Sequence, residues 1–125
     1  MLRTDADRLR RLRLASASAL APPPVILYVT TAGRADHHLR LARLRRYAAA
    51  RNWDVRAEII SRAPLTLPMG RRPEWPRIER MITKGYAQGI VTPDLNDVRH
   101  VDSYLTLRGW LDHHGAWLDI TEPTR

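Results

Sequence analysis

With 125 residues, 44% of them hydrophobic, the chain has the length and composition of one small globular domain and is too short for two. No apolar run approaches the roughly 20 residues that cross a bilayer, and arginines interrupt the N-terminal leucines, so we expect a cytoplasmic protein without membrane span or signal peptide. The absence of cysteine excludes disulfides, thiolate chemistry and cysteine–zinc sites. The net charge of +8, nearly all of it from arginine, fits either a polyanionic partner or a GC-rich genome, in which arginine codons are favoured over lysine codons.

Residues 1–24 are predicted to be a basic arm, helical or disordered, followed by a proline linker. Five arginines precede position 22, and Pro22, Pro23 and Pro24 would stop any helix. The arm is interpreted either as a solvated tail or as a segment that contacts nucleic acid or a partner. Its candidate contacts are Arg8, Arg10, Arg11 and Arg13.

Residues 25–121 are predicted to form the folded domain, with 122–125 as a tail. The continuous apolar run from Val25 to Val29 is typical of a strand buried on both faces. Residues 36–51 repeat apolar side chains at helical spacing, with Asp36 as the expected cap and arginines on the opposite face. Residues 53–60 are predicted to be a second strand, and 61–73, with three prolines and Gly70, an exposed loop.

The second half of the domain continues the alternation. A short helix with Trp75, Ile78, Met81 and Ile82 on one face is expected to end near Gly85, and residues 89–92 form a third strand. Residues 97–114 are predicted to be a longer helix, with Val98, Val101, Leu105 and Leu111 turned inward and Gly115 ending it; residues 116–120 form a fourth strand. The alternation predicts an α/β fold: a three-layer α/β/α arrangement around a mostly parallel four-stranded sheet.

Ligands in such folds collect at the C-terminal ends of the strands. The three loops expected there carry hydroxyls and guanidinium groups suited to phosphate. The candidate phosphate or nucleic-acid contacts are Thr30, Thr31, Arg34, Arg71, Arg72 and Arg99. Each also has an ordinary explanation: the threonines could simply end a strand, the arginine pair could be solvated, and in the third loop Asp97 could cap the following helix.

Other chemistries have little support. There is no GxGxxG after the first strand and no GxxxxGK[ST], which weakens dinucleotide and P-loop interpretations. The histidines, as His37-His38, His100 and His113-His114, lack HxxxH spacing, so we expect no metal and no cofactor. The four tryptophans are better explained by core packing than by base stacking.

Several stretches resemble the resolvase/invertase, or serine recombinase, catalytic domain. Ile26-Leu-Tyr28, a Thr-rich loop and Leu39-x-Leu-x-x-Leu44-x-x-Tyr47 resemble its N-terminal stretch. Arg72-Pro-Glu-Trp75 is similar to the start of the helix that follows the family's mobile loop. The segment from Gly89 to Leu118 is similar to the family segment that holds the LDRLSR-type motif. The resemblance spans about residues 25–120.

The resemblance also implies that the catalytic parts have been lost. Family members usually read Tyr-x-Arg-Val-Ser, with the serine attacking a DNA phosphodiester, whereas these positions here read Tyr28-Val-Thr30-Thr31-Ala32. The LDRLSR region keeps at most Arg99, and only five residues follow Ile120, where the family continues into a dimerisation helix and a DNA-binding domain.

The leading hypothesis is therefore a non-catalytic, recombinase-like domain in DNA-linked regulation, binding DNA through its arginine-rich surface. One alternative is a protein-interaction or structural module that binds itself or a partner without nucleic acid. Another is residual recombinase activity with Thr31 as nucleophile. No membrane partner is expected.

Overall fold

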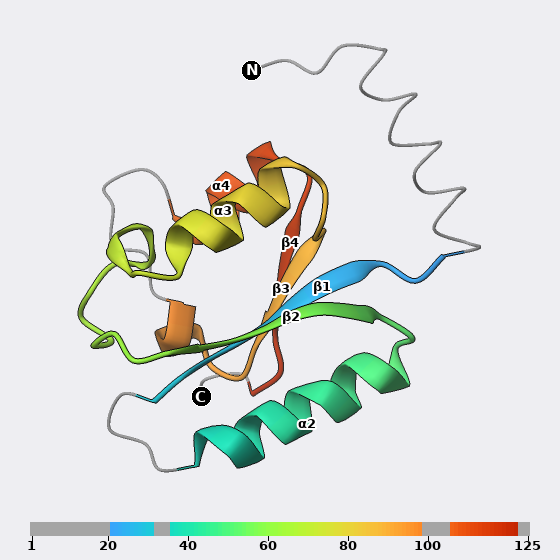
Figure 1. Ribbon diagram of the computed structural model, residues 1–125, viewed down its shortest axis with the longest axis horizontal. Coiled ribbons are helices and arrows are strands. Elements are labelled where there is room, and N and C mark those ends of the chain that lie inside the picture. Colours follow the sequence, from blue (N-terminus) through green and yellow to red (C-terminus); the bar gives the residue numbers. More distant parts are fainter. Residues whose placement is uncertain (1–20, 32–35, 99–105, 123–125) are drawn as a thin grey trace.

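A four-stranded, all-parallel sheet forms the centre of the computed structural model, which describes residues 21–31, 36–98 and 106–122 (Figure 1). The strands are β1 (Pro24–Thr30), β2 (Asp54–Ser61), β3 (Gly89–Thr92) and β4 (Trp117–Ile120). Their order is β2-β1-β3-β4, and every neighbouring pair is parallel. The predicted fold class is confirmed. The predicted arm lies almost entirely outside the described residues.

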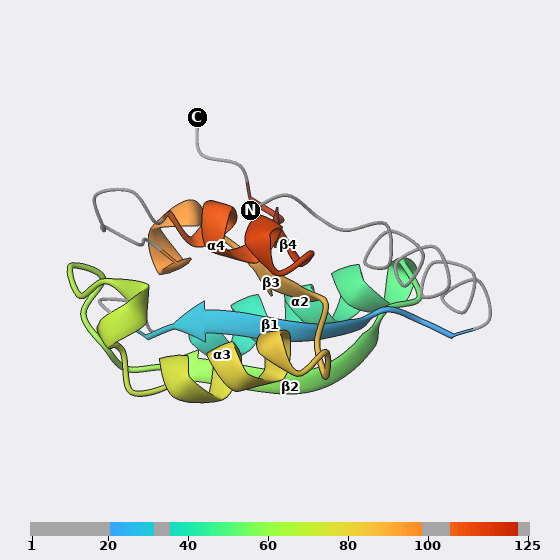
Figure 2. The ribbon, with the colours of Figure 1, turned by 90° about the horizontal axis from the view of Figure 1, so that it is seen from above.

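Strand β1 runs through the middle of the sheet (Figure 2), and its side chains contribute to both halves of the core. Because successive side chains of a strand point to opposite faces, Val25, Leu27 and Val29 pack on one side, with helix α2 (His37–Ala50). Ile26 and Tyr28 pack on the other side, with helices α3 (Trp75–Thr83) and α4 (Leu107–His113). This two-sided burial explains why the strand is apolar without interruption.

Helix α2 is short of β-branched residues and rich in alanine, leucine and arginine, which favour helix. It starts beside Asp36, as predicted, but the Asp36 side chain makes no capping hydrogen bond. The chain leaves the helix through Asn52, whose φ of +58° is in the left-handed region that asparagine tolerates better than most residues. Trp53 then packs beside the α2 face of the sheet, and β2 begins.

The predicted helix over residues 97–114 is wrong in its extent. Instead of one helix over 97–114, a 3-10 helix spans Leu95–Val98 and α4 begins only at Leu107. Thr106 has extended backbone angles, which no continuous helix allows. Val98 and Leu111 are buried as predicted, whereas Val101 and Leu105 lie outside the described residues.

The predicted exposed loop over 61–73 is wrong in part. A 3-10 helix at Met69–Arg71 turns the chain back toward the sheet. As a result, the side chains of Met69 and Arg72 are fully buried. Gly70 and Arg71 between them are exposed, as expected. The reason is the length of the loop, which lets its far end fold over the α3 face of β1.

Thr106→Ala is expected to lower the free energy of unfolding by about 1 kcal/mol. The Thr106 hydroxyl accepts a hydrogen bond from the Gly109 amide at 3.2 Å, which satisfies an amide at the start of α4 that has no partner within the helix. Urea denaturation measures the difference, and Thr106→Ser, which keeps the acceptor, is the control. An equal loss in both variants would show that the cap contributes nothing.

Candidate functional site at the strand ends

The strand order reverses direction between β1 and β3. The chain leaves β1 for its neighbour β2 and then returns across β1 to β3. In open parallel sheets such a reversal opens the crevice in which ligands bind, at the C-terminal ends of the strands. Thr30 ends β1 here and Thr31 follows it, Ser61 ends β2, and the 3-10 helix Leu95–Val98 follows β3.

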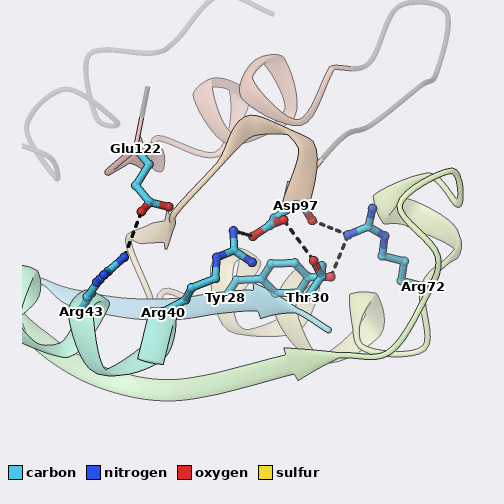
Figure 3. Close-up of polar contacts among 7 residues, drawn as sticks. All are labelled: Tyr28, Thr30, Arg40, Arg43, Arg72, Asp97 and Glu122. Carbon is cyan, nitrogen blue, oxygen red and sulfur yellow. Dashed lines mark hydrogen bonds and ion pairs between the residues drawn. The ribbon is translucent and has the colours of Figure 1, made fainter. Parts of the chain in front are cut away.

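Asp97 lies inside the protein, in the 3-10 helix after β3, and connects this helix to β1 and α2 (Figure 3). Its carboxylate accepts a hydrogen bond from the Thr30 hydroxyl at 3.0 Å and one from Nη2 of Arg40, on α2, at 2.6 Å. The Asp97 and Arg40 side chains are 0% and 2% exposed, so this is a fully buried ion pair. Val98 ends a 3-10 helix rather than beginning the predicted one, and the Asp97 carboxylate ties β1 and α2 to the turn after β3.

Arg72, at the end of the segment that follows β2, contacts the same cluster (Figure 3). Its Nη1 donates to the Tyr28 hydroxyl at 2.9 Å and to the backbone carbonyl of Asp97, while Nε donates to the Leu67 carbonyl at 2.9 Å. Burial raises the pKa of Tyr28, with the hydrogen bonds from Ser61 and Arg72 opposing that rise. The phenol therefore stays neutral and serves as an acceptor for the guanidinium.

Some donors of this cluster lack a partner. Within the described part of the chain, no hydrogen-bond acceptor reaches Nε and Nη1 of Arg40 or Nη2 of Arg72, and the Thr92 hydroxyl is also without a partner. Buried polar groups in proteins are nearly always hydrogen-bonded to protein, water or ligand. The two arginines therefore keep capacity for a further acceptor.

The structure brings together only some of the residues predicted to contact phosphate. Thr30 and Arg72 are both fully buried and both donate to Asp97, Thr30 to its carboxylate and Arg72 to its backbone carbonyl. Thr31 is partly buried and donates to the Ser61 carbonyl at 3.4 Å, whereas Arg71 is exposed. The other predicted contacts lie outside the described residues: Arg34, Arg99, and the arm residues Arg8, Arg10, Arg11 and Arg13.

Arg40 is the main residue that the sequence interpretation missed. The arginines of α2 were all expected on its solvent face, which is wrong for Arg40. The signal was present, because Arg40 precedes the buried Leu44 by four residues and Ala48 by eight and so shares their helix face. A charged residue on an apolar helix face indicates a buried partner.

No three His, Asp or Glu side chains gather into a metal-binding group among the described residues. No helix among them has both the length and the apolar character to cross a membrane.

The sequence matches no protein-family model and no curated protein. In structure, the chain is similar to the C-terminal catalytic domain of ISC1926 TnpA, an IS607-like serine recombinase, with a TM-score of 0.69 and 10% sequence identity. The similarity covers 82% of this chain and 72% of that one. The four-stranded parallel sheet and the three α-helices among the described residues therefore have the fold of a serine recombinase catalytic domain.

Proposed function

We propose that this domain retains the serine recombinase fold without its strand-transfer chemistry, and that it associates with DNA through exposed arginines. The observation that carries the first half is burial: Arg40 and Arg72, at the strand ends, are 2% and 1% exposed. Their guanidinium groups donate to Asp97 and Tyr28. A DNA phosphodiester needs solvent-facing donors to bind and be stabilised during attack.

The residues after β1 support the same conclusion. Where the resemblance places an arginine, Thr30 is buried with its hydroxyl donated to Asp97. Where it places the serine nucleophile, the sequence has Ala32, which carries no hydroxyl. With alanine at the nucleophile position and with Arg40 and Arg72 turned inward, neither the attack nor the stabilisation of the charge that develops in it is supported by these residues.

DNA association rests on the charge that remains outside. The chain carries a net charge of +8, and Arg62 and Arg71 are exposed in the segment that follows β2 at this edge of the sheet. Guanidinium groups bind phosphate oxygens bidentately. By contrast, Arg45 makes two hydrogen bonds to Glu58, at 2.7 and 2.6 Å, and is less available.

We expect the full chain to bind duplex DNA with an affinity that falls steeply as salt rises, because binding releases counterions. The double variant Arg62→Gln/Arg71→Gln should weaken binding and lower the salt slope by about 0.9 for each phosphate that the protein no longer neutralises. Fluorescence anisotropy over about 25–300 mM salt measures both effects. The control is Arg45→Gln/Arg56→Gln, which removes the same charge from two arginines that are already ion-paired.

Three outcomes would contradict this proposal. Equal decreases in affinity for the two double variants would mean that DNA binding depends on the net charge of the protein alone, and not on Arg62 and Arg71 at this edge of the sheet. Affinity no better than about millimolar at low salt would leave the protein-interaction module as the better interpretation. A covalent adduct with supercoiled DNA that disappears in Thr31→Ala would instead demonstrate residual catalysis.

A further inference from the structure

A pocket of about 200 Å³ lies between α2 and the ends of β3 and β4. It is lined by Arg40, Arg43, Tyr47, Pro93, Thr121 and Glu122. The first three lie on one face of α2, at helical spacing. The opposite wall is held by the sheet, since the amides of Thr121 and Glu122 donate to the carbonyls of Thr92 and Pro93 at 3.0 and 2.7 Å. One wall is thus helix, and the other consists of hydrogen-bonded backbone just beyond two neighbouring strands.

Arg40 gives this pocket a fixed positive group with unused donors. One bond to Asp97 holds its guanidinium in place, while Nε and Nη1 have no acceptor among the described residues. A buried donor without an acceptor costs about 1–3 kcal/mol, and more when it is charged. An oxyanion, which offers several acceptor lone pairs, would remove that cost.

Arg43 supplies a second guanidinium at the rim, opposite Glu122 (Figure 3). The two side chains are 3.6 Å apart and 56% and 48% exposed, so the pair is loose and screened by water. Glu122 can therefore be displaced by a carboxylate or phosphate that reaches Arg43. Tyr47 is not a competitor, because its hydroxyl donates to Asp119 at 2.9 Å.

The size of the pocket limits its occupant. Sites for drug-sized ligands measure roughly 300–1,000 Å³, and this one is smaller. We propose that the pocket binds a small free oxyanion, inorganic phosphate or a short carboxylate, held by Arg40 and Arg43 in place of Glu122. This inference is independent of DNA association, which rests on Arg62 and Arg71.

Titration calorimetry of the full chain with inorganic phosphate and, separately, malonate tests the proposal and distinguishes the two sources of the oxyanion. We expect saturable binding of at least one, weakened roughly tenfold or more by Arg43→Gln. Arg46→Gln removes the same charge from an exposed position of α2 outside the pocket and should change nothing. Glu122→Gln should tighten binding several-fold, because it removes the competing carboxylate.

The gain in Glu122→Gln is the decisive result, since a residue with a purely structural role would not improve anion binding when neutralised. The proposal is overturned if neither anion saturates the protein by about 50 mM, if Arg46→Gln weakens binding as much as Arg43→Gln, or if Glu122→Gln gives no gain. DNA binding by Arg43→Gln is measured in parallel. Unchanged DNA affinity together with weakened anion binding supports a separate site, and weakened DNA affinity without any free-anion binding overturns it.

Discussion

Asp97→Ala is expected to destabilise the domain by about 3–5 kcal/mol, because it leaves the Arg40 guanidinium buried without its counter-charge. The same change removes the acceptor of the Thr30 hydroxyl, which is also fully buried. The Asp97 carboxylate ties β1 and α2 to the turn after β3, across 67 and 57 residues of sequence. Denaturation by urea, with far-ultraviolet circular dichroism as the signal, gives the free energy of unfolding.

Two comparisons separate the cost of an unpaired charge from the value of the pair. Replacing both partners, as Arg40→Met with Asp97→Leu, should cost much less than Asp97→Ala alone, since no charge is then left buried. Glu58→Ala removes the carboxylate of an exposed pair and should cost at most about 1 kcal/mol. A cost below about 1 kcal/mol for Asp97→Ala would mean that water reaches Arg40 and that the ion pair is not sealed inside the protein.

Gly89→Ala is expected to cost about 2–3 kcal/mol, because there is no room for a methyl group on this residue of β3. A Cβ atom at Gly89 would lie 2.5 Å from Cδ2 and Cε2 of the Trp117 indole, on the neighbouring strand. The indole cannot move away freely, since the ring of Trp53 packs against it with centroids 4.7 Å apart. Either the two strands separate or the aromatic pair rearranges.

The matched control is the same substitution at Gly109, in α4. There the added Cβ would meet only the Thr106 hydroxyl at 3.4 Å, and alanine favours a helix over glycine, so stability should stay level or rise by up to about 1 kcal/mol. In a Trp117→Val background the cost of Gly89→Ala should fall below about 1 kcal/mol, because the clashing ring is gone. The same cost with and without the ring would rule out the steric explanation.

The elements of this fold were largely predictable from local pattern. All four strands and helices α2 and α3 lie close to their predicted ranges, because apolar runs and helical spacing are properties of neighbouring residues. The boundary at Thr106 was not predictable in the same way. Val98 and Leu111 suit one helical face, and no glycine or proline lies between Val98 and Thr106 to mark the extended Thr106.

The candidate site, too, was predictable from the sequence only in part. The sequence placed Thr30, Thr31 and the loop after β3 at one edge of the sheet, because parallel strands end together, and the reversal between β1 and β3 agrees. It did not predict that Arg72 turns inward to Tyr28 or that Arg40 pairs with Asp97. Those contacts join residues 44 and 57 positions apart, and local spacing carries no information about them.

By itself, then, the sequence determined the alternation of strands and helices, the parallel sheet and the absence of a serine at position 32, since each of these is a local property of the chain. Only the tertiary structure decided which arginines are buried and which face the solvent. Burial depends on what packs over a side chain from distant segments, so Arg40 and Arg72 became internal donors while Arg62 and Arg71 stayed in solvent. That division, more than the net charge, directs the DNA and anion proposals to different surfaces of the same small domain.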